Sequence, residues 1–188
     1  MDHFLDIRLR PALELSSNHL MDVLFGKLHL ALAARQAGDV GISFPGIAAG
    51  RNPGLGDIMR LHGNAAALDA LMAARWLAGA VDYVYCDSIA SVPVATGHRV
   101  VRRVQVKSSA DRIRRRQMQR HGYDEVQARE LVPASIERTL ALPYVNLRSA
   151  SSGQAFRLFI EHGPLRVTPQ NGRFSAYGLS LQATVPWF

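Results

Sequence analysis

The segment HFLDIRLRP, residues 3–11, gives the first indication of the fold. Between residues 5 and 10, apolar side chains alternate one by one with charged side chains. A period of two residues is that of a β-strand with one buried face, because successive side chains of a strand point to opposite sides. We therefore expect a half-buried strand over residues 3–10.

The segments that follow extend this strand into a regular alternation of elements. After Ser16 and Ser17, leucines recur every four residues, which predicts an amphipathic helix that ends near Gly38. Asn64 is a favourable cap for a second helix, which we expect to run to about Leu77. Further strands are predicted over residues 40–44, 57–62 and 81–92. The order strand, helix, strand, strand, helix, strand is that of the ferredoxin-like arrangement, which many RNA-binding proteins and many unrelated proteins share.

The chain changes its charge balance near residue 98. Residues 1–98 carry seven Lys and Arg residues against nine Asp and Glu residues, whereas residues 99–188 carry fifteen against six. Twenty of the 22 basic residues are arginine, whose planar guanidinium grips phosphates and base edges in a way that lysine does not. This asymmetry favours a polyanionic partner for the C-terminal half of the chain.

We accordingly expect an α+β protein with two domains. Residues 1–95 are expected to form a ferredoxin-like (RRM-like) domain, and residues 96–188 a second α+β domain that recognises the polyanionic partner. This second domain is expected to carry an arginine-rich helix over about residues 109–121, then a helical stretch over residues 124–140 that Pro133 interrupts. Its strands are predicted over residues 98–107, 144–149, 156–161, 165–167 and 174–179, with a turn at Asn171 and Gly172 before the last of them.

The arginine-rich helix presents a stripe of positive charge. Arg112, Arg116 and Arg120 are four residues apart, and Arg115 and Gln119 adjoin this stripe at a spacing of three. Like charges at a spacing of four destabilise a helix by roughly 0.2–0.5 kcal/mol per pair, and a phosphate backbone relieves that repulsion. The alternative is a solvated helix face, but such faces interleave Glu with Arg, and this helix contains almost no acid. The pattern favours a contact with nucleic acid.

Composition excludes several classes of protein and site. The single cysteine, Cys86, excludes an intramolecular disulfide and a zinc cluster of thiolates. The seven histidines show no His-x-x-x-His or His-Glu-x-x-His spacing, so we expect neither a metal nor another cofactor. No apolar stretch approaches the ~20 residues that cross a bilayer, so we expect a soluble, cytoplasmic protein without a membrane partner.

Three polar residues have two interpretations each when they are judged by residue type alone. His29 stands at the edge of the leucine stripe of the first helix, as a packing or surface histidine or as a proton carrier. Ser149 is either a loop hydroxyl or part of a site, and no Gly-x-Ser-x-Gly motif surrounds it. Tyr177 is either an ordinary strand aromatic or a partner of a site residue. The residues alone leave these alternatives open.

Three further residues have an RNA-binding interpretation beside an ordinary one. Phe156 precedes an apolar strand, where it either stacks on a base or packs in the core. Arg103 and Gln105 are two residues apart on a predicted strand and therefore point to one side. Both side chains suit base edges, and both are also common at exposed strand positions.

Several segments, in their order along the chain, resemble those of one known family. They are HFLDIRLRP (3–11), LMDVLFGKLH (20–29), GISFP (41–45), RRVQVKS (102–108), RIRRRQMQRHG (112–122), LPYVNLRSASSGQAFRLFIEHGP (142–164), YGLS (177–180) and VPWF (185–188). With these segments the chain resembles the type I-F CRISPR-associated endoribonucleases, which process precursor CRISPR RNA. The resemblance runs the whole length of the chain, and it implies a ferredoxin-like domain joined to a more divergent one.

The resemblance also implies a mechanism. The family cuts on the 3′ side of a short RNA hairpin and stays bound to the product. His29 corresponds to the general base that takes the proton from a ribose 2′-hydroxyl, Ser149 to the residue that holds this hydroxyl, and Tyr177 to a tyrosine that orients His29. The nucleophile belongs to the RNA itself, so the reaction needs no metal and gives a 2′,3′-cyclic phosphate and a 5′-hydroxyl.

The RNA contacts that the resemblance implies lie mostly on the arginine-rich helix. Arg116 and Arg120 correspond to arginines that enter the major groove of the hairpin. Residues of the preceding strand match the readers of base pairs at the foot of the stem, and Phe156 matches the aromatic residue that stacks under the last pair. The full set of expected RNA-binding residues is Arg103, Gln105, Lys107, Arg112, Arg115, Arg116, Gln119, Arg120, His121 and Phe156.

Two functions from different classes remain to be compared. The first is a single-turnover endoribonuclease whose partners are the CRISPR repeat hairpin, as precursor and as product, and other subunits of a type I-F surveillance complex. The second is a hairpin-binding subunit of a ribonucleoprotein without catalysis, which shares every binding residue and differs only at His29, Ser149 and Tyr177. A DNA-binding regulator is disfavoured because the sequence has no helix-turn-helix signal.

Overall fold

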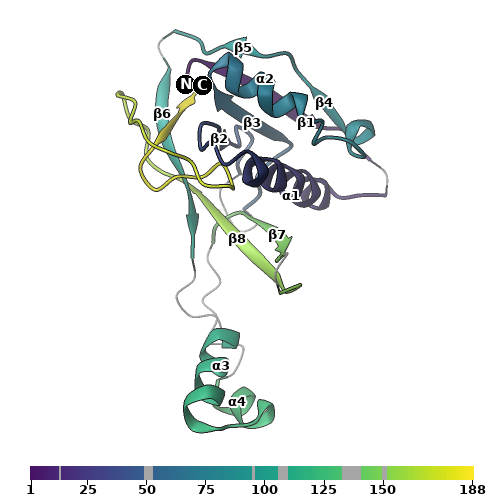
Figure 1. Ribbon diagram of the computed structural model, residues 1–188, viewed down its shortest axis with the longest axis vertical. Helices are drawn as coiled ribbons and strands as arrows, with labels where there is room; N and C mark the ends of the chain where they lie inside the picture. Colours follow the sequence, from purple (N-terminus) through teal and green to yellow (C-terminus); the bar gives the residue numbers. More distant parts are fainter. Residues whose placement is uncertain (13, 49–52, 95, 106–109, 133–140, 150–151) are drawn as a thin grey trace. The chain divides into compact units, whose positions relative to one another are not determined.

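The computed structural model describes residues 1–12, 14–48, 53–94, 96–105, 110–132, 141–149 and 152–188, without the side chains of residues 110–112 (Figure 1). Over these residues the chain is a mixed α+β protein with two antiparallel sheets and four α-helices. The chain forms two compact units: unit 1 is Met1–Arg103 with Leu142–Phe188, and unit 2 is Val104–Ala141. The predicted division into domains at residue 95 does not follow these units and stays a prediction.

The first sheet of unit 1 contains the predicted opening strand at its centre. Its strands are β1 (His3–Leu9), β2 (Gly41–Ser43), β3 (Ile58–Gly63) and β4 (Val84–Cys86) in the order β2-β3-β1-β4, and β5 (Ala90–Ser91) also pairs with β1. The apolar face of β1 is buried, as its alternation predicts. Asp6 on the other face is buried as well, because the guanidinium of Arg60 on β3 donates to both of its carboxylate oxygens at 2.6 and 2.9 Å.

The two helices of unit 1 are α1 (Ser17–Arg35) and α2 (Ala65–Ala73), which contact each other and β1 (Figure 1). The side chains of Ser16 and Asn64 accept hydrogen bonds from backbone N–H groups three residues later, so both helices begin where the sequence predicts. Their ends differ from the prediction. In α1 it is Gln36 that adopts the left-handed conformation of the C-cap, and α2 ends before Leu77 because Arg75 has a φ of 49°.

The second sheet consists of β6 (Gly97–Val104), β7 (Tyr144–Arg148), β8 (Ala155–His162) and β9 (Thr184–Trp187), in the order β7-β8-β6-β9. The predicted strands over residues 144–149 and 156–161 are confirmed as β7 and β8, while β6 ends three residues before Lys107, which lies outside the described residues. Buried side chains of both sheets belong to one continuous core, which includes Val101, Val145, Leu158 and Val185.

Three sequence predictions about strands are wrong. Residues 81–92 form a short 3-10 helix, η1 (Val81–Tyr83), and the separate strands β4 and β5 in place of one strand. Residues 165–167 form a single β-bridge, between Arg166 and His98, in place of a strand, and Leu165 and Val167 are exposed. Residues 174–179 are not a strand, because a turn occupies this segment. The chain forms β9 near its end instead, where Pro186 made a strand difficult to expect.

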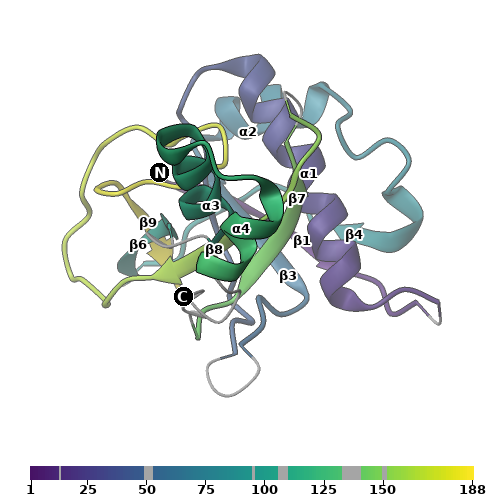
Figure 2. The ribbon, with the colours of Figure 1, turned by 90° about the horizontal axis from the view of Figure 1, so that it is seen from below.

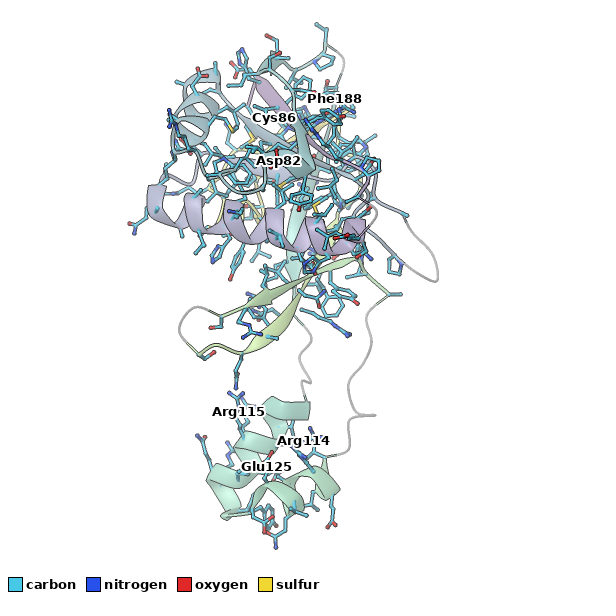
Figure 3. All side chains as sticks on the ribbon, turned by 90° about the vertical axis from the view of Figure 1, so that its right-hand side faces the viewer. Asp82, Cys86, Arg114, Arg115, Glu125 and Phe188 are labelled. Atoms are coloured by element: carbon cyan, nitrogen blue, oxygen red, sulfur yellow. The ribbon has the colours of Figure 1, made fainter. Side chains whose placement is uncertain are left out.

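Unit 2 contains α3 (Ala110–His121) and α4 (Glu125–Leu131), which pack against each other (Figure 3). Gly122, with a φ of 70°, ends α3 as predicted. Asp124 begins α4 through a capping box with Gln127. The guanidinium Nε of Arg114 donates to the carbonyl oxygen of Val132 at 2.9 Å and so joins α3 to the end of α4. The remainder of the helical stretch predicted to residue 140 lies outside the described residues.

None of the described helices is both long enough and apolar enough to cross a bilayer.

Candidate functional site

Unit 1 contains a groove with a volume of about 1090 Å³ between α1, the end of β6, the β7–β8 hairpin and the loop before β9. The elements α1 and β7, which both contribute residues to this groove, lie side by side (Figure 2). Five residues that the sequence analysis selected line it together, namely His29, Arg103, Ser149, Phe156 and Tyr177. They come from four separate segments of the chain, so the fold brings the predicted catalytic residues into one site.

His29 has a defined orientation at the edge of α1. Leu28 beside it is buried in the core and Leu30 is exposed, so His29 stands at the boundary between the two faces of the helix. Its Nδ1 lies 2.9 Å from the carbonyl oxygen of Ala176. A carbonyl oxygen only accepts hydrogen bonds, so Nδ1 carries the proton in this contact. In the neutral imidazole the lone pair is then on Nε2.

Tyr177 stacks on the imidazole of His29. The two rings are nearly parallel, at 10°, with centroids 4.0 Å apart, and Phe25 lies on Tyr177 with a centroid distance of 6.2 Å. Tyr177 lies in a tight turn and not in the strand that the sequence predicted. Gly178 makes this turn possible: its φ is 69°, and a Cβ atom there would lie 2.7 Å from Ile42 Cγ2. The same turn thus supplies both the carbonyl and the ring that hold His29.

The β7–β8 hairpin presents Ser149 and Phe156 to the groove. Ser149 follows β7, and its backbone N–H donates to the carbonyl oxygen of Gln154 at 2.8 Å. The backbone N–H of Gly153 donates to the carbonyl oxygen of Ser149, also at 2.8 Å. Its hydroxyl oxygen accepts from the backbone N–H of Ser152 at 3.3 Å. These bonds fix Ser149 at the hairpin turn, where it lines the groove.

Arg103 at the end of β6 contacts two aromatic rings of the groove. The carbon atom of its guanidinium lies 5.7 Å from the ring centroid of Phe156 and 5.9 Å from that of Tyr177. Both distances are within the range of a cation–π contact. The contact keeps the charged group of Arg103 beside the ring of Phe156.

The other predicted RNA-binding residues belong to unit 2 or lie outside the described residues. The exposed side chains described on α3 are those of Arg115, Arg116, Gln119, Arg120 and His121, while residues 113, 114, 117 and 118 are half-buried. Figure 3 labels Arg114 and Arg115, which belong to these two faces. His121 is exposed and stacks on Tyr123 at 5.5 Å, and Gln105 is exposed after the end of β6. Lys107 and the side chain of Arg112 are not described.

Several residues of the groove were not found by sequence reasoning. The carbonyl oxygen of Ala176 belongs to the backbone, which gives no residue signal. The groove-lining residues of α1, by contrast, have helical spacing: they are His19, Asp22, Val23, Gly26, Lys27, His29 and Leu30. This second periodicity, on the face opposite the buried leucines, is the signal that could have located the groove wall.

Two other histidines of unit 1 are unsuitable for proton transfer at neutral pH. Burial lowers the pKa of His62 to about 3 and the pKa of His162 to about 4. His62 lies 2.8 Å from the hydroxyl oxygen of Ser43, and neither histidine lines the groove. Within the described part of the chain, no group of three or more His, Cys, Asp and Glu side chains is arranged to hold a metal ion.

Comparison with known proteins identifies the family of this chain. The family model described as "CRISPR-associated protein (Cas_Csy4)" matches residues 4–188. The CRISPR-associated endonuclease Cas6/Csy4 of Pseudomonas aeruginosa (strain UCBPP-PA14) is 50% identical to the chain over 188 residues, with all of both chains aligned. Its namesake from Escherichia coli (strain UTI89 / UPEC) is 48% identical over the same length and coverage. The resemblance expected from the sequence is thereby confirmed, and the chain belongs to the Cas_Csy4 family of CRISPR-associated proteins.

Proposed function

We propose that this chain is a metal-independent endoribonuclease that processes precursor CRISPR RNA, cutting it at the 3′ base of the repeat hairpin. The observation that carries the proposal is the orientation of His29, whose Nδ1–H is committed to the Ala176 carbonyl and whose ring is stacked on Tyr177. A packing histidine does not need this combination at the wall of an open groove. The curated relatives, which are named endonucleases, support the same activity class.

The proposed reaction uses the RNA as its own nucleophile. Nε2 of His29 takes the proton from the 2′-hydroxyl before the cut, and the 2′ oxygen attacks the adjacent phosphorus. The bond from phosphorus to the 5′ oxygen breaks, and that oxygen takes up a proton from solvent. The products are a 2′,3′-cyclic phosphate and a 5′-hydroxyl. DNA has no 2′-hydroxyl, so it is not cut.

The other groove residues have complementary roles in this proposal. Ser149, at the hairpin turn, holds the 2′-hydroxyl for attack. Phe156 stacks under the last base pair of the stem, and Arg103, which contacts its ring, reads the base pair or its backbone. Together they set which phosphate lies beside His29.

Recognition of the stem is assigned to the exposed arginine face of α3. Arg115, Arg116 and Arg120 share this face with Gln119, and guanidinium groups can contact both phosphates and guanine edges. Gln105, Lys107, Arg112 and His121 extend the same proposed RNA contact. In functional terms, residues 1–95 form a ferredoxin-like domain that supplies His29, which the β-α-β-β-α-β element order and the strand order of the first sheet support. Residues 96–188 supply the RNA recognition.

The protein is proposed to stay bound to its cleaved hairpin and to act once per molecule. Membership in a CRISPR-associated family supports a further role beside other subunits of a type I-F surveillance complex. The competing function, a hairpin-binding subunit without catalysis, predicts tight binding of the repeat RNA and no cut.

The test is to incubate the protein in EDTA with a hairpin RNA from its own CRISPR repeat. We expect cleavage with about one product per protein molecule, and none when the nucleotide before the cut carries a 2′-deoxyribose. His29→Ala is expected to abolish cleavage and to leave hairpin affinity nearly unchanged. His3→Ala is the matched control, because His3 lies on β1 outside the groove, and it is expected to cleave like the wild type.

Two outcomes contradict the proposal. Tight binding of the intact RNA without cleavage favours the non-catalytic subunit. A loss of hairpin affinity in His29→Ala equal to its loss of cleavage shows that His29 is a structural residue.

A further inference from the structure

Among the described residues that line the groove, Asp22 is the single acidic side chain. The basic side chains and histidines there are His19, Lys27, His29, Arg103 and Arg148. A carboxylate repels RNA phosphates, so its presence in a groove that binds RNA requires a separate reason. That reason lies in what Asp22 contacts.

Asp22 makes two hydrogen bonds to one residue of the neighbouring strand. Its Oδ1 accepts from the backbone N–H of Asn146 at 2.8 Å, and its Oδ2 accepts from Nδ2 of the same residue at 2.8 Å. β7 is an edge strand of the second sheet, so this N–H has no neighbouring strand on its outer side. Hydrogen bonds to a charged acceptor are about twice as strong as neutral ones. The pair therefore ties α1 to β7 at one defined register.

The same junction continues toward the catalytic residues. A Cβ atom on Gly26 would lie 3.8 Å from Leu147 Cδ2, so α1 and β7 remain in close contact one helical turn after Asp22. From Asp22 to His29 the helix advances seven residues, or about 10 Å. From Asn146 to Ser149 the strand and its extension advance three residues, also about 10 Å. His29 and Ser149 thus lie at about equal distances along their segments from the contact between Asp22 and Asn146.

We propose that Asp22 and Asn146 form a positioning pair that sets the separation between His29 and Ser149. This inference rests on the proposed function, because it assumes that both residues act on one 2′-hydroxyl. Asp22 does not touch the RNA in this role. It fixes α1, which carries the general base His29, against β7, which leads to Ser149. An error of about 1 Å in the separation of two such groups can slow a reaction by about 100-fold.

An exchange of the two side chains tests the pair. Asn146→Asp brings two carboxylates together and removes the Nδ2 donor. The double variant Asp22→Asn/Asn146→Asp restores both bonds, since the new asparagine accepts from the backbone N–H and donates to the new aspartate. Asn18→Asp is the charge-matched control, because it adds a negative charge to α1 at an exposed position outside the groove lining.

The readouts are the single-turnover cleavage rate at saturating protein and the Kd for a hairpin with a 2′-deoxyribose at the cut. We expect Asn146→Asp to lower the rate by about tenfold or more and to change the Kd by less than about threefold. The double variant is expected to recover the rate to within about threefold, and Asn18→Asp to retain it. Asp22→Ala removes both acceptors without adding repulsion, and it is expected to lower the rate in the same way. It replaces Asn146→Asp in the test if that variant does not fold.

Three outcomes overturn the inference. They are an unchanged rate in both Asn146→Asp and Asp22→Ala, a slow rate that the double variant does not recover, and losses of rate and affinity in equal proportion. Each leaves the proposed function intact while the wild type cleaves and His29→Ala does not. If the wild type binds the hairpin without cleaving it, the proposed function itself has failed.

Discussion

At the scale of single residues, His29 is held by two kinds of contact that act on different properties of the imidazole. The Ala176 carbonyl selects the tautomer, and the ring of Tyr177 selects the orientation. Since the stacking contact uses the face of the tyrosine ring, its phenolic hydroxyl is not required for it. The two contacts come from one turn, which Gly178 closes against Ile42.

Substitution at Tyr177 separates the ring from the hydroxyl. Tyr177→Phe keeps the stacked ring and is expected to cleave within about twofold of the wild type. Tyr177→Leu removes it, and the loss of roughly 0.5–1.5 kcal/mol for an aromatic pair corresponds to a rate that is about 2- to 12-fold lower. The measurement is the single-turnover cleavage rate at saturating protein. A Tyr177→Phe variant as slow as Tyr177→Leu would show that the hydroxyl has the main role.

The residue types alone did not predict this arrangement. His29 and Ala176 are 147 residues apart in the sequence, and a carbonyl oxygen leaves no trace in residue type. Tyr177 was expected in a strand, because the apolar residues around it resemble one, and the φ of Gly178 overrides that pattern. The family resemblance identified His29, Ser149 and Tyr177 as partners, and the fold brings them to one groove.

At the scale of elements, α3 has two faces with different tasks. Its half-buried face contacts α4, and Arg114 belongs to this face through its bond to the carbonyl of Val132. Its exposed face holds Arg115, Arg116 and Arg120. Arg114 therefore has a structural role on this helix, and the proposed function assigns the RNA contact to the arginines of the exposed face.

Arginine-to-alanine variants distinguish these groups. Arg116→Ala is expected to weaken hairpin binding by ~1–3 kcal/mol if the guanidinium contacts a base with two hydrogen bonds. Arg129→Ala is the matched control on α4, where Arg129 pairs with Glu125 at 2.6 Å, and it is expected to bind normally. The measurement is the Kd of each variant for the hairpin, from filter binding at fixed salt concentration. Equal affinities for the two variants would remove Arg116 from the interface.

Elements with strong local signals were predictable from the sequence, and those that depend on distant partners were not. The caps at Ser16 and Asn64 begin α1 and α2 where they were expected, and Gly122 ends α3 where it was expected. β9 was missed because Pro186 weakens a strand signal, and pairing with β6 decides its conformation. Residues 165–167 have the composition of a strand, but the side chains of Leu165 and Val167 are exposed and do not pack in the core.

At the scale of the whole molecule, two neutral histidines, the buried His62 and the half-buried His162, link folding to pH. Nε2 of His162 accepts a hydrogen bond from the backbone N–H of Phe44 at 3.2 Å, and His62 lies beside Ser43 in the core. Protonation of either ring would place a charge in an apolar environment and, at His162, would break the bond to Phe44. Burial accordingly lowers both pKa values, to about 3 for His62 and about 4 for His162.

The free energy of unfolding is therefore expected to fall below about pH 6.5. In the unfolded chain a histidine takes up its proton near pH ~6.5, so from there toward pH 4 the unfolded state binds more protons than the folded state. Each histidine contributes a slope of up to ~1.4 kcal/mol per pH unit, and stability decreases as the pH is lowered. Urea unfolding between pH 7.5 and 4.5 measures this slope.

His62→Gln tests the source of the slope, because glutamine can keep a hydrogen bond to Ser43 and does not titrate. Its unfolding free energy is expected to depend less steeply on pH than that of the wild type. The control His3→Gln, at a partly exposed position on β1, is expected to keep the wild-type slope. Identical slopes for His62→Gln and the wild type would exclude His62 as the cause.

The division of the chain into two compact units also has an evolutionary consequence. Unit 2 interrupts unit 1 between β6 and β7, and every described residue of the main core belongs to unit 1. A lineage can therefore replace the arginines of α3, or alter the length of the segment around it, while the packing around His29 is inherited unchanged. On the proposed function, the enzyme and the repeats in its own genome can diverge together, and the chemistry of the cut stays constant.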